Sequence, residues 1–511
     1  MAVAMLQEVV APSTTDCSWV EQTPELDDYQ AGALRRILNL SARAPNDWSG
    51  MFGPDNFGED FSALRFQLAY MAYALALAHL HRLPAAPGVF REPFDNLIQK
   101  ILSPDCWIYW SHVSTADGPL NKHLGKLPQK WDPVAEDNIM YSAYVQSMAL
   151  MYHYLFRDDK YAQPGALTFE LKTKFWNEGG FKFPYDEKSL NELIYWQMAE
   201  MGFLGVACEP DCVFQICNQP NLIGFRMHDL VYGGDLAGEA SQGYIKAWSE
   251  FGMIDEGGFF RAFVIKQPRL PITIEGASMN FWLMTLLHSW YPKIVEQQYP
   301  ILKERYLLDG PQGSQWIMPP VRFGATIDDP RSAMDMSWAA CCASEMGDTE
   351  TLTNLLAYAD RFMNPVWEDG AYFYKRRDEN FDKDGYFIGM DPASGNAMFN
   401  YARLNVKDGL KKLFEGGWDK QHFDEPALLD VPGDVDVRRA FFDSQRNALA
   451  VTLGKPARKR AITLEVSLPN GRDLPAIFRD GEAVTESVER SDGGFTLKVP
   501  HGKRSTFVFQ W

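Results

Sequence analysis

The chain has 511 residues, of which 46% are hydrophobic and 14% aromatic, so it is long and apolar enough for a large packed core. Its 67 acidic and 49 basic residues give a net charge of −18. This balance excludes the basic stripe that nucleic-acid-binding proteins need, and it disfavours binding to anionic membrane surfaces. We therefore expect no nucleic-acid partner and no stable membrane insertion.

Residues 1–25 contain Ser, Thr and Pro without periodicity, which predicts a loose N-terminal leader. The first residues lack the basic region and the apolar region of a secretory signal, and no apolar run of about 18 residues predicts a membrane span. The seven cysteines are an odd number and are not spaced like a disulfide framework. We therefore expect a cytoplasmic protein with free thiols.

From Leu26 onward the hydrophobic pattern is helical. The absence of alternating parallel strands predicts antiparallel helix pairs over residues 26–427, which we expect to close into an α/α toroid. Two short hairpins, at 257–265 and 370–374, interrupt the helices. The expected helices are 31–42, 61–83, 93–102, 137–156, 167–177, 188–202, 218–232, 239–251, 276–290, 292–307, 335–346, 349–362 and 395–414.

The pattern changes after about Leu428, where apolar residues begin to alternate with polar ones. This alternation predicts a small antiparallel, sandwich-like β-domain over residues 428–511, with a structural role. The expected strands are 448–453, 461–466, 476–479, 495–499 and 505–509.

Three of the seven cysteines, Cys208, Cys212 and Cys217, lie within ten positions. Their spacing lacks the paired C-x₂-C of a zinc site, and a Cys208–Cys217 disulfide is disfavoured in a reducing compartment. A thiol titrates near pH 8.5, so one cysteine of such a group can donate a proton while another accepts one. The alternative is that all three are small buried hydrophobic residues.

The other motifs in the sequence give little support for a catalytic or metal-binding role. Cys341 and Cys342 fall within a helix of small residues, where core packing explains them, and Asn380–Gly385 is interpreted as an exposed acidic loop rather than a calcium site. No P-loop, G-x-G-x-x-G, G-x-S-x-G or H-E-x-x-H motif is present. We therefore expect no metal and no redox or nucleotide cofactor.

Two stretches together resemble a known family. Asn138-Ile139-Met140-Tyr141 opens an expected helix, and Cys208-Glu209-Pro210-Asp211, Phe214 and Cys217-Asn218 follow it. In this order and at this distance they resemble the linalool dehydratase-isomerase family, over roughly residues 30–415. The resemblance implies an (α/α)₆ barrel with a hydrophobic central pocket, and cofactor-free acid–base chemistry on an isoprenoid alcohol or alkene.

The resemblance also implies roles for individual residues. Cys208 and Cys217 match the two cysteines that line the family's site, and Asp47 corresponds to an aspartate of the first inter-helix loop. Two positions depart from the family pattern: a tyrosine is replaced by Phe66, and a histidine by Tyr144. The pocket is therefore expected to persist while the substrate and the reaction differ.

An allylic or tertiary cation needs an acid, a base and an aromatic wall that excludes water. We expect Cys208, Cys217, Tyr144 and Asp47 to transfer protons. The expected substrate-binding residues are Phe66, Tyr70, Tyr73, Trp107, Asn138, Tyr141 and Phe214. For each wall residue, packing in the core is the alternative.

The first functional hypothesis is therefore a lyase, isomerase or cyclase that acts on a hydrophobic terpenoid or prenylated aromatic compound of secondary metabolism, by protonating or deprotonating an alkene. The second is a carbohydrate-active enzyme, because α/α toroids with a β-domain also serve glycosidases, lyases and epimerases. The third is a non-catalytic binding protein that uses the same pocket. Each is compatible with a homo-oligomer.

Overall fold

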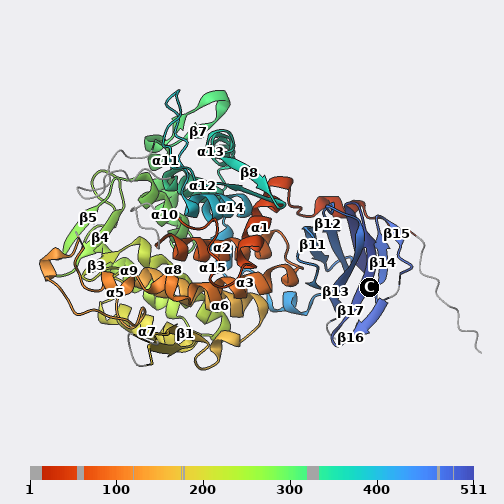
Figure 1. Cartoon of the computed structure of the whole chain (residues 1–511), viewed down its shortest axis with the longest axis horizontal. Helices are drawn as coiled ribbons and strands as arrows, with labels where there is room; N and C mark the ends of the chain where they lie inside the picture. The colour runs from red at the N-terminus through yellow and green to blue at the C-terminus, as the bar shows by residue number, and fades with distance from the viewer. Residues whose placement is uncertain are drawn as a thin grey trace, which may run out of the picture. The chain divides into compact units, whose positions relative to one another are not determined.

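The computed structural model describes residues 14–53, 62–118, 120–173, 175, 179–318, 333–468, 472–486 and 488–511. The chain divides into two compact units (Figure 1). One unit comprises Gly32–Leu77 and Arg91–Gly417, and the other comprises Met1–Ala31, Ala78–Phe90 and Trp418–Trp511. Residues 1–13 of the expected leader lie outside the described residues.

The chain is mainly helical up to residue 417, as the sequence predicted. The helices are α1 (Asp28–Ser41), α2 (Ser62–His81), α3 (Pro87–Ile101), α4 (Pro104–Trp107), α5 (Trp110–Val113), α6 (Ile139–Phe156), α7 (Glu187–Glu200), α8 (Gln219–Tyr232), α9 (Leu236–Ser249), α10 (Ala277–Leu287), α11 (Pro292–Tyr306), α12 (Met334–Met346), α13 (Thr349–Phe362), α14 (Phe399–Leu404) and α15 (Gly409–Phe414).

Alternate helices of this unit pack on one another in sequence order. Helix α6 packs on α8, α8 on α10, α10 on α12, and α12 on α14. Each intervening helix, α7, α9, α11 and α13, packs on its predecessor. Every residue of α10 is buried, whereas α13 buries one face only, so the first set forms the interior and the second set covers it.

Two helix predictions were wrong. The expected helix 167–177 begins instead with strand β1 (Leu167–Leu171), which pairs antiparallel with β2 (Phe181–Tyr185). Leu167 and Phe169 are buried and Thr168 between them is more exposed, a period-2 pattern that fits a strand better than a helix. The expected helix 395–414 is divided into a π-helical turn, Ser394–Met398, and the helices α14 and α15.

The hairpins appear where they were expected. Strand β3 (Cys212–Phe214) pairs with β4 (Arg261–Ile265), which pairs with β5 (Leu270–Thr273). Strands β8 (Pro365–Glu368) and β9 (Ala371–Tyr374) form a second hairpin, and β6 (Leu308–Asp309) pairs with β7 (Gln315–Trp316). The first of these sheets begins at Cys212 and so supports the cysteine segment from one side.

The C-terminal residues form two antiparallel sheets, which confirms the predicted separate β-region. One sheet has the order β10-β13-β17-β16 and the other β11-β12-β18-β14-β15. Val20, near the N-terminus, is buried against Ala448, Ala450, Phe478 and Val508 of this core. The strands are β10 (Leu428–Asp430), β11 (Val437–Asp443), β12 (Ala448–Leu453), β13 (Arg460–Ser467), β14 (Ala476–Arg479), β15 (Glu482–Ala483), β16 (Val488–Ser491), β17 (Gly494–His501) and β18 (Ser505–Gln510).

Candidate functional site

The cysteine segment is a tight turn followed by a short strand. The Cys208 amide donates to the Cys212 carbonyl at 2.9 Å, and the Cys212 amide donates to the Glu209 carbonyl at 2.9 Å. Asp211 has a positive φ of 70°, a conformation that the short polar side chain of an aspartate tolerates. After β3, a 3₁₀ turn (Ile216–Asn218) turns the chain toward α8. The two ends of the segment therefore return toward each other.

Asn138, which precedes α6, holds this turn in place. Its amide donates to the Cys208 carbonyl at 3.1 Å, and its side chain donates to the Pro133 carbonyl at 2.8 Å. Its side-chain oxygen accepts a hydrogen bond from the Tyr109 hydroxyl at 2.7 Å. Asn138 is 1% exposed and has a φ of 55°. It therefore acts as a buried connector that fixes Cys208 relative to α6.

Asn218 closes the segment from the other side. Its side-chain oxygen accepts from the Val206 amide at 2.8 Å, and its side-chain nitrogen donates to the Val206 and Phe214 carbonyls, each at 2.9 Å. A side-chain amide that is saturated in this way fixes the backbone on both sides of Cys217.

The thiols of Cys208 and Cys217 lie close enough to influence each other's protonation. All seven cysteines are free, so this contact is not a disulfide. Cys208 is 7% exposed and Cys217 is 3% exposed. Burial raises the pKa of the Cys217 thiol well above its ordinary value, and the proximity of Cys208 raises it further. Cys217 therefore keeps its proton.

An aromatic cluster lies beside the thiols, and Tyr70 is at its centre. The Tyr70 ring meets five neighbouring rings edge to face, with centroid distances of 4.7 Å to Trp338, 5.4 Å to Tyr73, 5.8 Å to Tyr144, 6.3 Å to Trp282 and 6.4 Å to Tyr401. All five distances fall within the range of attractive aromatic contacts. The cluster joins helices α2, α6, α10, α12 and α14.

The hydroxyl of Tyr70 accepts two hydrogen bonds. The Trp282 Nε1–H donates at 2.5 Å and the Tyr144 hydroxyl donates at 3.5 Å. Burial raises the pKa of Tyr144 well above its ordinary value, and the nearby Cys217 thiol contributes to the same rise. Tyr144 is therefore a neutral phenol that lies between the thiol pair and Tyr70.

Phe66 and Tyr73 extend the cluster. Phe66 meets Tyr144 at 6.2 Å and Trp282 at 5.5 Å, both edge to face. The Tyr73 hydroxyl lies 2.6 Å from the Ser147 hydroxyl, so its polar atom is satisfied within the core. Phe66 is 3% exposed and Tyr73 is fully buried. Phe66 therefore lies against Tyr144 and Trp282, and Tyr73 lies against Tyr70 and Ser147.

Arg65 supplies positive charge beside the thiols. Its guanidinium lies 4.6 Å from the Phe66 ring centre and 4.3 Å from that of Tyr109, which is the geometry of a cation–π contact. This charge opposes the rise in the pKa of Cys217. Burial raises the pKa of Tyr109, and the proximity of Cys208 and Glu209 adds to that rise.

The structure places four of the predicted residues elsewhere. Trp107 and Tyr141 pack on Phe169 at 6.4 and 5.9 Å, and their polar atoms donate to the Leu102 and Ile101 carbonyls, at 3.0 and 2.7 Å. Phe214 stacks on Phe263 at 4.4 Å. Asp47 accepts from the Ser49 amide and hydroxyl, at 3.0 and 2.5 Å, which lowers its pKa. Among the described residues, none of these four side chains makes a hydrogen bond to a thiol of the pair or a ring contact with the Tyr70 cluster.

Sequence reasoning missed three residues of this site, which are Arg65, Tyr109 and Trp282. Tyr109 belongs to the Trp-rich stretch before the Asn138 helix, and its position between Trp107 and Trp110 was the available signal. Arg65 directly precedes Phe66 on the second helix. Trp282 had no signal, because its role depends on the packing of α10 against α2 and α12.

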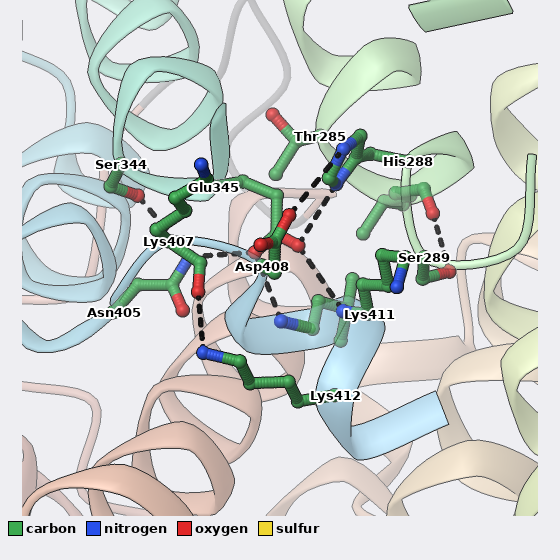
Figure 2. A network of polar contacts seen from close by, with 12 residues as sticks. Thr285, His288, Ser289, Ser344, Glu345, Asn405, Lys407, Asp408, Lys411 and Lys412 are labelled. Carbon is green, nitrogen blue, oxygen red and sulfur yellow. Dashed lines mark hydrogen bonds and ion pairs between the residues drawn. The ribbon is translucent and has the colours of Figure 1, made fainter. Parts of the chain in front are cut away.

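A second polar cluster of the helical unit surrounds Glu345, at the C-terminal end of α12 (Figure 2). Its carboxylate is fully buried and accepts from four groups: the Leu410 amide at 2.9 Å, the Lys411 amide at 3.2 Å, Asn405 Nδ2 at 2.9 Å and His288 Nδ1 at 3.2 Å. Glu345 therefore caps the N-terminus of α15 and joins it to α10 and α14.

Asp335 and Asp391 form a third buried polar group. Asp335 accepts from the Ser278 amide at 2.8 Å, and Asp391 accepts from the Ser394 amide and hydroxyl, each at 2.8 Å. Burial, aided by the charge of Asp391, raises the pKa of Asp335 to about 6. Burial also raises the pKa of Asp391. Both carboxylates begin helical segments, so capping explains their positions.

Among the described residues, no group of three or more His, Cys, Asp or Glu side chains has the arrangement of a metal site. Among those same residues, no helix is both long and apolar enough to cross a bilayer.

Comparison with solved structures gives distant similarities to glycoside hydrolases. An inactive variant of the alpha-1,6-mannanase GH76A of Salegentibacter sp. HEL1_6, in complex with alpha-1,6-mannotriose, is 10% identical, covers 75% of this chain and 99% of its own, and has a TM-score of 0.40. An alpha-amylase from Clostridium perfringens is 10% identical, covers 73% and 98%, and has a TM-score of 0.39. The GH127 beta-L-arabinofuranosidase Ara127N-Se from Geobacillus stearothermophilus T6 is 11% identical, covers 94% and 75%, and has a TM-score of 0.30.

The family comparison is more specific. The model of the family described as linalool dehydratase/isomerase matches residues 65–380, more than half of the chain. The matched range begins at Arg65 and includes Tyr70, Tyr144 and both thiols of the pair. The chain therefore belongs to the linalool dehydratase/isomerase family.

Proposed function

We propose that this protein is a cofactor-independent lyase or isomerase that acts on a hydrophobic isoprenoid substrate by acid–base chemistry at Cys208 and Cys217. The observation that carries the proposal is the proximity of the two buried thiols to each other and to Tyr144 of the Tyr70 cluster. Two adjacent sulfurs can supply an acid and a base at one place.

In this mechanism Cys217 is the acid and Cys208 is the base. The raised pKa of Cys217 keeps a proton on that sulfur, so it can protonate the oxygen of an alcohol or a carbon of an alkene. On dehydration the C–O bond breaks and water leaves, and the Cys208 thiolate removes a proton from a neighbouring carbon as the C=C bond forms. A proton then moves from Cys208 to Cys217 and restores the starting state of both thiols, so the reaction consumes no external acid.

The aromatic cluster stabilises the positive charge that develops between these two steps. The faces of Phe66, Tyr70 and Trp282 present negative charge density to a cation, an interaction worth roughly 2 kcal/mol when it is desolvated. The neutral phenol of Tyr144 lies between this wall and Cys217. It offers a hydroxyl where the family pattern has a histidine, so it can orient a substrate oxygen without itself becoming charged.

We also propose that the helices close into an (α/α)₆ ring. The successive packing of α6, α8, α10, α12 and α14 supports this arrangement, with α2 as the sixth inner helix through the contacts of Tyr70 with Tyr144 and Trp338. The thiol pair and the aromatic cluster then face the interior of the ring.

The experiment that tests the function uses the full chain in D₂O with linalool, geraniol and a prenylated phenol as probes. When a carbon of an alkene is protonated, we expect deuterium at that carbon of the product, detected by mass spectrometry, because the proton given by Cys217 exchanges with solvent; a probe that is only dehydrated should give an unlabelled alkene and water. Cys217→Ala and Cys208→Ala should each abolish the label. Cys342→Ala is the matched control, since Cys342 is a buried cysteine on α12 outside the thiol pair.

Two results would contradict the proposal. Deuterium incorporation that persists in both cysteine variants would exclude the thiol pair as acid and base. Release of reducing sugar from an α-linked oligosaccharide, with no change in any isoprenoid probe, would favour the carbohydrate-active alternative.

A further inference from the structure

The β-sheet unit contains a surface hollow of about 460 Å³ that the reaction above does not use. It lies where the first residues of β13, the end of β14 and the turn between β17 and β18 come together. The residues that line it are Lys459, Arg460, Arg479, Pro500, His501, Gly502 and Lys503. Four of these seven are permanently basic, and none is acidic.

This concentration of positive charge is unusual for the chain. Residues 418–511 hold as many basic as acidic residues, fourteen of each, whereas the whole chain has a net charge of −18. Carboxylates compensate two of the four cations: Asp434 pairs with Arg460, and Asp480 pairs with Lys503 at 2.9 Å. The other two, Lys459 and Arg479, make no ion pair with a carboxylate among the described residues.

Arg479 is held by a neutral partner. Its Nε and Nη2 donate to the Ser505 hydroxyl at 3.3 and 3.0 Å, which orients the guanidinium but leaves its charge uncompensated. A fixed guanidinium of this kind presents a fork of donors that matches the oxygens of a phosphate or sulfate group.

His501 lies at the base of the hollow and is 1% exposed. No hydrogen bond of ordinary geometry reaches either ring nitrogen among the described residues, although the Gly454 carbonyl lies close to the ring. Burial lowers the pKa of His501, and the charges of Arg479 and Arg460 lower it further, while the Gly454 carbonyl and Asp434 partly oppose this change. A buried imidazole with so few partners is uncommon in native proteins, and here burial and the neighbouring cations favour its neutral form.

Gly502 makes room for one of these cations. A Cβ atom at this position would approach Lys459 Cγ to 2.8 Å and Cδ to 3.1 Å, so the lysine stem lies directly over the glycine. The absence of a side chain at residue 502 therefore allows Lys459 to lie across the hollow.

We propose that this hollow is a binding site for a small oxyanion of the phosphate or sulfate type, held by Lys459, Arg479 and His501. An anion would compensate the two unpaired cations and would accept a hydrogen bond from the buried imidazole, whereas a neutral ligand would leave the repulsion in place. Because an anion favours the imidazolium form, binding is coupled to proton uptake by His501. The site belongs to the β-sheet unit and does not depend on the proposed thiol chemistry.

The test is a titration of the full-length protein with inorganic phosphate, followed by the imidazole C–H signals of His501 in NMR spectra, which His501→Gln assigns. We expect saturation at one site per chain and a rise in the pKa of His501 when phosphate is bound. Lys459→Gln and Arg479→Gln should each weaken phosphate binding about tenfold, the usual effect of losing one charge-assisted hydrogen bond. Lys498→Gln, at an exposed lysine of β17 outside the hollow, is the control and should leave the affinity unchanged.

A second variant separates geometry from total charge. Gly502→Ala leaves every charge in place but displaces the Lys459 stem, so it should weaken phosphate binding severalfold. Binding to vesicles that contain phosphatidic acid, but not to vesicles of phosphatidylcholine alone, would show that the site accepts a phosphate carried by a lipid. Binding of inorganic phosphate without binding to either kind of vesicle would show that the site takes free phosphate.

Three results would overturn the proposal. The first is that neither phosphate nor phosphatidic-acid vesicles bind saturably at phosphate concentrations up to about 10 mM. A dissociation constant of that size corresponds to a binding free energy of roughly 3 kcal/mol. The second is an equal loss of affinity in Lys498→Gln, which would indicate non-specific charge screening. The third is displacement by chloride as effectively as by sulfate.

Discussion

The thiol pair and the Glu345 cluster are both buried in the helical unit, yet their surroundings are opposite. The Glu345 carboxylate accepts from four groups of α10, α14 and α15 (Figure 2). The thiols of Cys208 and Cys217 lie near each other, and neither makes a hydrogen bond with another side chain among the described residues. A fully satisfied buried charge stabilises packing, whereas a polar pair with few partners remains available for chemistry.

Substitution of Cys217 should have the largest effect, and it tests the difference between the two clusters most directly. Cys217→Ala should lower the turnover of whichever isoprenoid probe is accepted by about a thousandfold, because the general acid is lost. The free energy of unfolding should change by about 1 kcal/mol, since a thiol is a small buried group. Steady-state kinetics and urea unfolding measure the two quantities. A large loss of stability with unchanged turnover would make Cys217 a packing residue.

Glu345 should show the reverse behaviour. Glu345→Ala removes a buried acceptor of four hydrogen bonds, so the free energy of unfolding should fall by about 3 kcal/mol. Turnover per folded molecule should stay within a few-fold of the wild type. Chemical unfolding measured alongside activity on the folded fraction checks both statements. If turnover fell a thousandfold while stability held, the distinction between the two clusters would fail.

Asp335 lies at the other end of α12 from Glu345, and it should make the stability of the helical unit depend on pH. Its pKa is raised to about 6, above the ordinary 3.8, so the folded state binds the proton more tightly than the unfolded state does. Its contribution to stability is therefore present below pH 4 and is lost as the pH rises from about 4 to 6, by on the order of 2 kcal/mol. Urea unfolding at pH 4.5 and 6.5 should show this loss in the wild type relative to Asp335→Asn.

Asp47 is the control, because its pKa is shifted in the opposite direction to that of Asp335. Hydrogen bonds from Ser49 lower its pKa, so its contribution to stability is present above the ordinary pKa and is lost as the pH falls. Asp47→Asn should therefore lose stability on the neutral side, where Asp335→Asn gains it. The same direction of change in both variants would contradict the assignment of the Asp335 shift to burial.

Tyr141→Phe should have the smallest effect. The variant removes one hydroxyl that donates to the Ile101 carbonyl at 2.7 Å, so the free energy of unfolding should fall by about 1 kcal/mol. Turnover should change little, because the Tyr141 ring packs on Phe169 rather than beside the thiols. Tyr144→Phe is the matched variant on the same helix and should lower turnover at least tenfold. Equal turnover in the two variants would remove Tyr144 from the site.

Much of the fold could be predicted from periodicity. The long apolar helices α6 and α10 and the alternating strands β12 and β18 lie close to their predicted positions, because their patterns repeat over many residues. Short elements were less predictable. Leu167–Leu171 has too few residues for a period of 2 to be told from a helical pattern, and its pairing with Phe181–Tyr185 decided the outcome.

The site was predictable only in part. The family resemblance predicted membership in a family that the comparison confirmed, and it directed attention to Cys208 and Cys217. Their catalytic role stays a prediction. Trp282 and Arg65 were not predictable, because a single aromatic or basic residue on an apolar helix has many packing explanations.

The sequence by itself therefore determined the helical class, the separate β-region and the cysteine segment as the place to look, since these depend on patterns that are local along the chain. The tertiary structure decided which side chains meet. Tyr70 from α2, Tyr144 from α6 and Trp282 from α10 are more than seventy residues apart in sequence, and their contact depends on helix packing. Tertiary structure also decides the protonation of Cys217, because the raised pKa of its thiol depends on burial and on the neighbouring Cys208.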